Sequence, residues 1–142
     1  MDEMREGDGS IDAVWAATSP DSGRFDPMET RSAAGVLRSR LAELEARGAG
    51  YLEVRRLARE FPVLSLGFRG SEAVVQAFRS ADDVAILTGW GKNPSGAITV
   101  PILHEEATFD SWAGVSLQSA WELIEAFLRG AELESLGAWV EL

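Results

Sequence analysis

The 142-residue sequence has no cysteine and only one histidine and one lysine. Without cysteine the chain can form no disulfide and no thiolate metal site, which fits a reducing compartment. Enzymes draw most of their nucleophiles, bases and metal ligands from Cys, His and Lys. This composition therefore favours a binding protein over a catalyst.

Long apolar runs are also missing. The first ten residues are acidic and have no apolar core, so they do not form a secretory signal. No stretch approaches the roughly 20 apolar residues that a membrane span needs. We expect a cytoplasmic protein with a single domain over residues 1–142, in which residues 1–10 form a disordered tail.

Acidic residues dominate the charge of the chain. There are 23 Asp and Glu against 13 Lys and Arg, which gives a formal net charge of -10. Such a charge attracts a basic partner over about one Debye length and speeds encounter, and it argues against nucleic acid as a direct ligand. For any single acidic cluster, a solvated surface that maintains solubility is the simpler interpretation.

Two segments have the periodicity of amphipathic helices. Residues 26–29 (DPME) have the pattern of a capping box with proline at the first helical position, which predicts a helix from there to Gly48. Ser116 is a typical N-cap for a second helix that ends at Gly130. The apolar stripes are Ala33, Leu37, Leu41 and Leu44 in the first helix, and Leu117, Ala120, Trp121, Ile124, Phe127 and Leu128 in the second.

Between the two helices the apolar period changes to two, which is typical of strands. An extended arm at 11–17 and a helix at 72–79 are competing interpretations, and residues 105–114 are expected to form an acidic loop. The sequence predicts an α+β fold with a mainly antiparallel sheet of about five to seven strands and two amphipathic helices packed on one face. The expected strands are 11–17, 51–57, 63–68, 73–78, 84–90, 97–103 and 136–142.

Patterns that would carry catalysis are sparse. His104 and the two acids after it could form half of a metal site, but the chain has no second histidine, so a structural or surface histidine is favoured. The neighbouring acids Asp82–Asp83 and Glu105–Glu106 resemble paired carboxylates, although nothing in the sequence fixes a spatial pair. We predict no catalytic residue, no metal and no cofactor.

Tryptophans near acidic residues give the stronger signal for binding. Trp90 ends an expected strand and Trp112 lies in the acidic loop, so both are candidates for exposure, whereas Trp121, Phe127 and Trp139 are expected in the core. Packing of Trp90 and Trp112 over the sheet end is the alternative. Exposed tryptophan beside acids suits a hot spot against a basic partner. The expected binding face comprises Asp82, Asp83, Trp90, Glu105, Glu106, Asp110 and Trp112.

The order of elements adds a resemblance. A strand run that begins near residues 61–66 (FPVLSL), the Ser-capped helix 116–130 and Trp139 in a final strand resemble an immunity-protein family of bacterial polymorphic toxin systems, the first in the usual numbering. This resemblance implies an α+β fold and a small cytoplasmic antidote that blocks a toxin, often a nucleic-acid deaminase or nuclease. Such a toxin needs a basic surface, which an acidic antidote can occupy.

Two other classes of function stay open. An acidic chaperone or adaptor for a secreted effector would share the charge and the size, but it would bind an unfolded segment of its client. A small-ligand module or enzyme would use the region around His104.

Overall fold

Strands are the commonest regular element of the chain, whose structure is a computed structural model that describes residues 12–88 and 96–141. The helices are α1 (Ala34–Arg47), α2 (Leu117–Leu128) and the short α3 (Leu133–Leu136), with a 3₁₀ turn at Ser111–Ala113. The strands are β1 (Asp12–Thr18), β2 (Phe25–Ala33), β3 (Ala49–Arg56), β4 (Val63–Arg69), β5 (Glu72–Ser80), β6 (Asp83–Thr88), β7 (Ile98–Ile102), β8 (Glu105–Phe109), β9 (Val115–Ser116) and β10 (Ala138–Glu141).

The main sheet has eight strands in the order β10-β6-β5-β4-β3-β1-β2, with β9 paired to β5. Every pair in it is antiparallel. The strands β7 and β8 form a separate two-stranded hairpin. The predicted α+β class and the mainly antiparallel sheet are confirmed, with one strand more in the main sheet than the upper end of the expected range.

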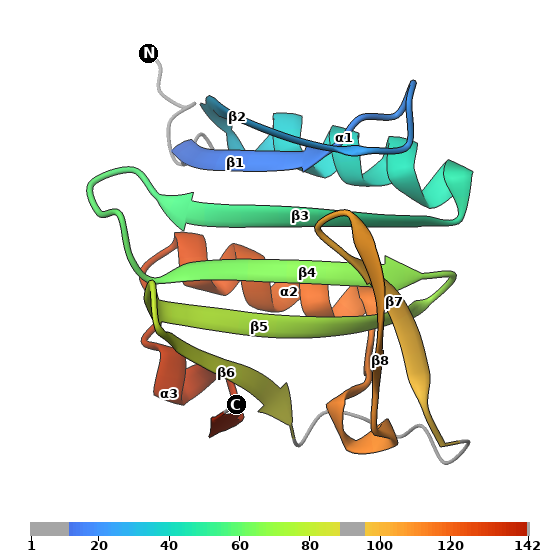
Figure 1. Cartoon of the computed structure of the whole chain (residues 1–142). Helices are drawn as coiled ribbons and strands as arrows, with labels where there is room; N and C mark the ends of the chain where they lie inside the picture. The colour runs from blue at the N-terminus through green and yellow to red at the C-terminus, as the bar shows by residue number, and fades with distance from the viewer. Residues whose placement is uncertain (1–11, 89–95, 142) are drawn as a thin grey trace.

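Both long helices cover the same face of this sheet, as predicted (Figure 1). Strand alternation explains the arrangement, because Leu52 and Val54 point to the helices and are buried, whereas Glu53 and Arg55 point to the other side. Aliphatic and aromatic side chains from both helices complete this core. They are Leu37, Leu41, Leu44, Leu117, Ala120, Trp121, Leu123, Ile124, Phe127 and Leu128.

Helix α2 forms as its sequence predicts. The Ser116 hydroxyl accepts a hydrogen bond from the Ser119 backbone N–H at 3.0 Å, as an N-cap should. The expected core residues Trp121 and Phe127 are buried. Trp139 is half-buried against the same core and donates from its indole nitrogen to the Leu133 carbonyl at 2.9 Å.

The predicted start of the first helix is wrong. Residues 25–33 form edge strand β2, and α1 begins only at Ala34, after an N-cap, Ala33, that makes no side-chain cap bond. The Asp26 carboxylate does accept from a nearby backbone N–H, that of Met28 at 3.0 Å, but this bond closes a local turn where the β1–β2 register shifts. Pairing with β1 therefore prevails over the capping pattern.

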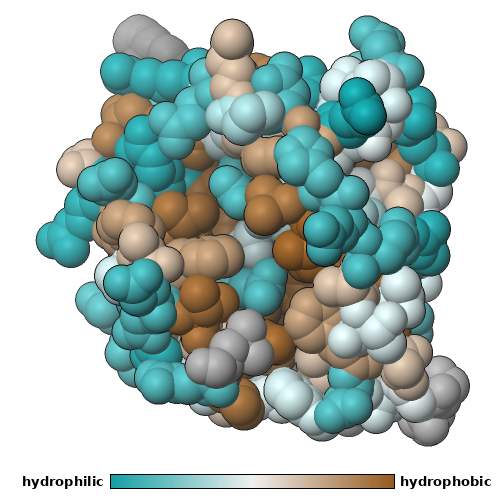
Figure 2. All heavy atoms as spheres, viewed as in Figure 1, coloured by the Kyte–Doolittle hydropathy of each residue, from teal (hydrophilic) through white to brown (hydrophobic). Residues whose placement is uncertain are grey.

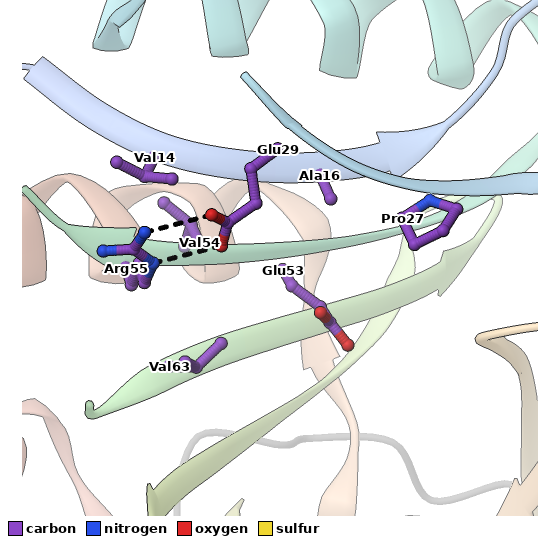
Figure 3. Close-up of a pocket in the computed structure, with 8 residues that line it drawn as sticks. All are labelled: Val14, Ala16, Pro27, Glu29, Glu53, Val54, Arg55 and Val63. Carbon is purple, nitrogen blue, oxygen red and sulfur yellow. Dashed lines mark hydrogen bonds and ion pairs between the residues drawn. The ribbon is translucent and has the colours of Figure 1, made fainter. Parts of the chain in front are cut away.

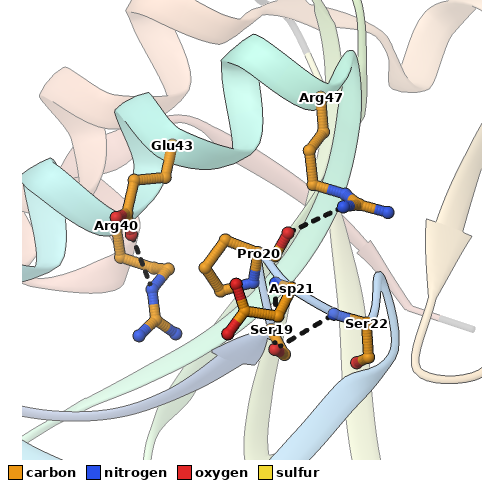
Figure 4. Close-up of polar contacts among 7 residues, drawn as sticks. All are labelled: Ser19, Pro20, Asp21, Ser22, Arg40, Glu43 and Arg47. Atoms are coloured by element: carbon orange, nitrogen blue, oxygen red, sulfur yellow. Dashed lines mark hydrogen bonds and ion pairs between the residues drawn. The ribbon is translucent and has the colours of Figure 1, made fainter.

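The turn between β1 and β2 is fixed to the end of α1 (Figure 4). The Arg47 guanidinium donates to the Pro20 carbonyl at 2.7 Å, and the Ser19 hydroxyl accepts from the backbone of Asp21 at 3.2 Å. Gly48 ends the helix in the left-handed region at φ 98°, where glycine has no steric penalty. The helix therefore ends where the sequence predicts.

The expected loop at 105–114 is also corrected. Residues 105–109 form β8 and pair with β7 around the two-residue turn Leu103–His104. This hairpin packs on the sheet face opposite the helices (Figure 1). Its core contains Val74 and Ile86 of the sheet, with Ile98 and Val100 of the hairpin. The expected final strand at 136–142 starts later, at Ala138, because residues 133–136 form α3.

Two expectations lie outside the described residues: the disordered tail at residues 1–10 and the placement of Trp90. Among the described helices, none combines the length and apolar character needed to cross a bilayer.

Candidate binding surface

The hairpin covers only part of the sheet face on which it lies. Beyond it, antiparallel register aligns side chains from successive strands, with Arg55 opposite Val63, Val63 opposite Phe78, and Phe78 opposite Val84. Because paired residues point to the same side of a sheet, these groups share one surface. We call this surface the open face; it comprises Glu53, Arg55, Val63, Phe78, Val84 and Val140.

Apolar side chains on the open face are only partly shielded from solvent. Val63, Phe78 and Val84 are half-buried, and Val140 on edge strand β10 remains 42% exposed. Figure 2 shows hydrophobic side chains in the middle of this side of the molecule, with hydrophilic ones around them. An apolar patch with a polar border is the usual form of a protein contact surface.

A row of polar groups crosses the sheet beside these apolar residues. Glu53, Ser65 and Gln76 lie opposite one another on β3, β4 and β5. The buried Ser65 hydroxyl lies 3.3 Å from the side-chain oxygen of buried Gln76, and the Tyr51 hydroxyl donates to a carboxylate oxygen of Glu53 at 2.7 Å. Among the described residues, the other end of the Gln76 amide has no hydrogen-bond partner.

Burial raises the pKa of Tyr51 well above its ordinary value of about 10. The negative charge of Glu53 raises this pKa further, and so does the hydrogen bond that the phenol donates to that carboxylate, while a hydrogen bond with Ser65 opposes the shift. Tyr51 is therefore a neutral donor that holds Glu53 in place.

Alkaline titration should reveal this state, because Tyr51 is the only tyrosine of the chain. Raising the pH above about 10 should leave the tyrosinate absorbance of the folded protein low, while the free energy of unfolding falls by about 1.4 kcal/mol per pH unit. The sign follows from the raised pKa: the unfolded chain loses this proton first, so stability present below pH 10 is lost as the pH rises.

Tyr51→Phe is the control for this titration, because it keeps the ring and removes the ionisable group. The fall in unfolding free energy should be shallower in this variant. A tyrosinate signal that appears near pH 10 while the wild-type protein is still folded would contradict the buried placement of Tyr51.

One hollow opens over β1 at the edge of the open face, between β2 and β3 (Figure 3). The carboxylate of Glu29 reaches from β2 and binds the Arg55 guanidinium with two hydrogen bonds, at 3.0 and 3.1 Å. These bonds lower the pKa of Glu29. Glu53 also lines the hollow, with its carboxylate pointing away from Arg55 (Figure 3).

A guanidinium shared by two acids lies on the helix side of the sheet, where Arg79 lines a hollow with Glu132, Leu133 and Glu134. Arg79 forms ion pairs with Asp83 at 3.3 Å and with Glu141 at 2.9 Å. Asp82 is exposed beside them and forms no ion pair with another described residue. The net acid at the border of the open face therefore comes from Glu29 and Glu53 against Arg55.

The acids of the expected binding face fall into separate places. Asp82 lies in the turn before β6 and Asp83 begins that strand, just before Val84 of the open face. Glu105 and Glu106 begin β8 at the tip of the hairpin, where Glu106 binds the guanidinium of Arg69. Within each neighbouring pair one acid is bound by an arginine, so neither forms a pair of free carboxylates.

Trp112 and Asp110 of the expected face lie in a third place, after β8. Trp112 is 43% exposed in the 3₁₀ turn after β8, and its indole donates to the Asp110 carboxylate at 3.2 Å. Its carbonyl accepts from Thr88 at 3.3 Å, which places it at the end of β6, opposite to the end that holds Asp83. Of the expected face, only the first acid pair adjoins the open face.

His104 has a structural setting. It is exposed in the hairpin turn, where its ring lies edge-on to Phe25 with centroids 6.0 Å apart. Within residues 12–88 and 96–141, no cluster of three or more His, Asp or Glu side chains is arranged to hold a metal ion.

Sequence reasoning missed the open face, because its apolar residues look like ordinary strand residues. Val63, Phe78 and Val84 fit the period of two, and nothing in that pattern says which sheet face is covered. The available signal was Ser65 and Gln76, polar residues inside otherwise apolar strands. No protein-family model matches this chain, and no curated protein is similar enough to count as a match.

Proposed function

We propose that this chain is an immunity protein, which binds and blocks a bacterial toxin whose contact surface is basic. The toxin would be a deaminase or nuclease that acts on nucleic acid, and the antidote would act in the cytoplasm by covering the surface that the toxin uses for its substrate. This mode of inhibition needs steric contact and no catalytic residue.

The open face is the observation that carries this proposal. It combines exposed or half-exposed Val63, Phe78, Val84 and Val140 with an excess of acid at the border formed by Glu29, Glu53 and Arg55. Apolar anchors inside a charged border give tight complexes, because the anchors supply affinity and the border supplies fast, selective association.

Charge outside this face supports a basic partner. Several arginines are occupied by internal ion pairs, such as Arg38 with Glu45 and Arg40 with Glu43. Among the described residues, Asp82 and Glu105 have no such pairing and are exposed. Exposed acidic side chains without an arginine partner therefore contribute to the net charge of -10 that a partner meets.

Association kinetics with the toxin domain encoded by the neighbouring gene test the proposal. The double variant Asp82→Lys, Glu105→Lys should lower the association rate constant by about 10-fold at low salt, and the difference should shrink as salt rises. Neither side chain takes part in an ion pair with another described residue, so the fold should stay intact. Stopped-flow fluorescence measures the rate.

The matched control is Glu122→Lys, Glu125→Lys, which changes the net charge equally but lies on α2, at the helix side of the sheet. This variant should associate at nearly the wild-type rate. Absence of any complex between the wild-type chain and the neighbouring gene product would overturn the proposal. Binding only to unfolded client peptides would favour the chaperone alternative instead.

A further inference from the structure

We infer that the open face is the docking site of the toxin, and that the partner supplies a protruding loop or strand with an apolar side chain flanked by lysine or arginine. This inference rests on the proposed function and adds the surface and the chemistry of the contact. The elements that define the site are β3 to β6 and β10.

The apolar part of the open face is continuous across strands. Val63, Phe78 and Val84 are direct neighbours in the antiparallel register, and Val140 lies opposite Ile86 on the next strand. Neither the helices nor the hairpin shields them fully, since the helices pack on the other side and the hairpin core uses Val74, Ile86, Ile98 and Val100. An apolar side chain of a partner can pack against this row.

Polar groups at the floor of the same surface are incompletely satisfied. Gln76 is only 7% exposed, yet among the described residues its amide bonds only to Ser65. One carboxylate oxygen of Glu53 binds Tyr51, and within the described residues the other has no hydrogen-bond donor. The free carboxylate oxygen of Glu53 favours a partner that brings a donor, as lysine and arginine do, whereas the free Gln76 amide nitrogen needs an acceptor, such as a backbone carbonyl of the partner's loop or strand.

Charge complementarity selects a basic partner over a second copy of this chain. The border of the open face holds Glu29 and Glu53 against Arg55, and the whole molecule carries -10. A second copy would bring the same acidic border, so like charges would face each other. Residues 1–10, with four acids and one arginine, would meet the same repulsion.

The test is a pair of valine substitutions with the same chemistry on opposite sides of the sheet. Val140→Lys places a cation on the open face, at a position 42% exposed. Val36→Lys does the same on α1, where valine is 51% exposed. Calorimetry with the toxin domain encoded by the neighbouring gene should show a dissociation constant at least about 30-fold larger for Val140→Lys, which is the order of magnitude expected when a hot-spot contact is lost. The dissociation constant of Val36→Lys should be unchanged.

Phe78→Ala provides a second readout that changes no charge. It should weaken binding by at least about 10-fold while the variant still melts cooperatively, because Phe78 is half-buried and not part of the helix-side core. Circular dichroism of each free variant verifies that the fold is retained before binding is measured.

The outcomes separate the two proposals. A wild-type complex that tolerates both Val140→Lys and Phe78→Ala would overturn this docking site and leave the immunity function standing. No wild-type complex at all would overturn the function, and the docking site with it. A concentration-dependent dimer of the free chain, abolished by Val140→Lys, would assign the open face to a second copy instead.

Discussion

Gly67→Val is expected to lower the free energy of unfolding by about 3 kcal/mol and to detach the β7–β8 hairpin from the sheet. A Cβ atom at Gly67 would collide with the backbone carbonyl oxygen of Pro101 and would lie 3.1 Å from the Ile102 side chain. A backbone atom in a paired hairpin cannot rotate away as a side chain can, so the hairpin itself must move. Chemical denaturation measures the loss.

Hydrogen exchange locates the effect of this substitution. Amides of residues 98–109 should lose protection in Gly67→Val, while those of α2 should keep it. Gly35→Ala is the control, because an added Cβ at Gly35 of α1 meets nothing within 4 Å. Alanine there should stabilise the protein by roughly 0.5 kcal/mol, since glycine is a poor helix residue. Equal stability of Gly67→Val and the wild type would refute the close approach of hairpin and sheet.

Arg56→Met should destabilise the fold by about 2–3 kcal/mol, because a charge-assisted cap of α2 is lost. The Arg56 guanidinium donates to the Phe127 carbonyl at 2.8 Å and to the Ala131 carbonyl at 2.5 Å. It also lies over the Phe127 ring, 4.2 Å from its centroid. Methionine keeps much of the apolar contact and removes the donors, so urea denaturation isolates their contribution.

Arg59→Met is the matched control for this cap. Arg59 is exposed on the loop between β3 and β4, so its replacement should change the free energy of unfolding by less than about 0.5 kcal/mol. Arg56→Lys should recover only part of the lost stability, because one ammonium group cannot reproduce the planar fork. Identical stabilities of Arg56→Met and Arg59→Met would contradict the capping role.

The helix-side half of the fold could be predicted from the sequence because its signals are local. Ser116 caps α2 whatever lies around it, and the spacing of Trp121, Ile124 and Phe127 fixes the side that must be buried. Alternation of Leu52 and Val54 with Glu53 does the same for β3. Each of these choices depends on residues within a few positions of one another.

Errors arose where a local pattern competes with pairing to a distant segment. The DPME segment at 26–29 has the residues of a helix start, yet β1 offers backbone partners to residues 25–33, and strand pairing prevails. The β7–β8 hairpin turns at Leu103–His104, where Leu103 adopts φ 56° without the glycine or asparagine that usually marks such a turn. The strand β8 therefore looked like part of a loop.

For the binding surface, the sequence by itself determined the acidic charge, the amphipathic helices and the strands that carry Val63, Phe78 and Val84. Tertiary structure alone decided that the hairpin covers one part of the sheet and leaves these residues partly open. It also separated Asp83 from Trp112, at opposite ends of β6. The reason is physical: strand periodicity specifies that a side chain points to one face, whereas long-range packing decides what covers that face.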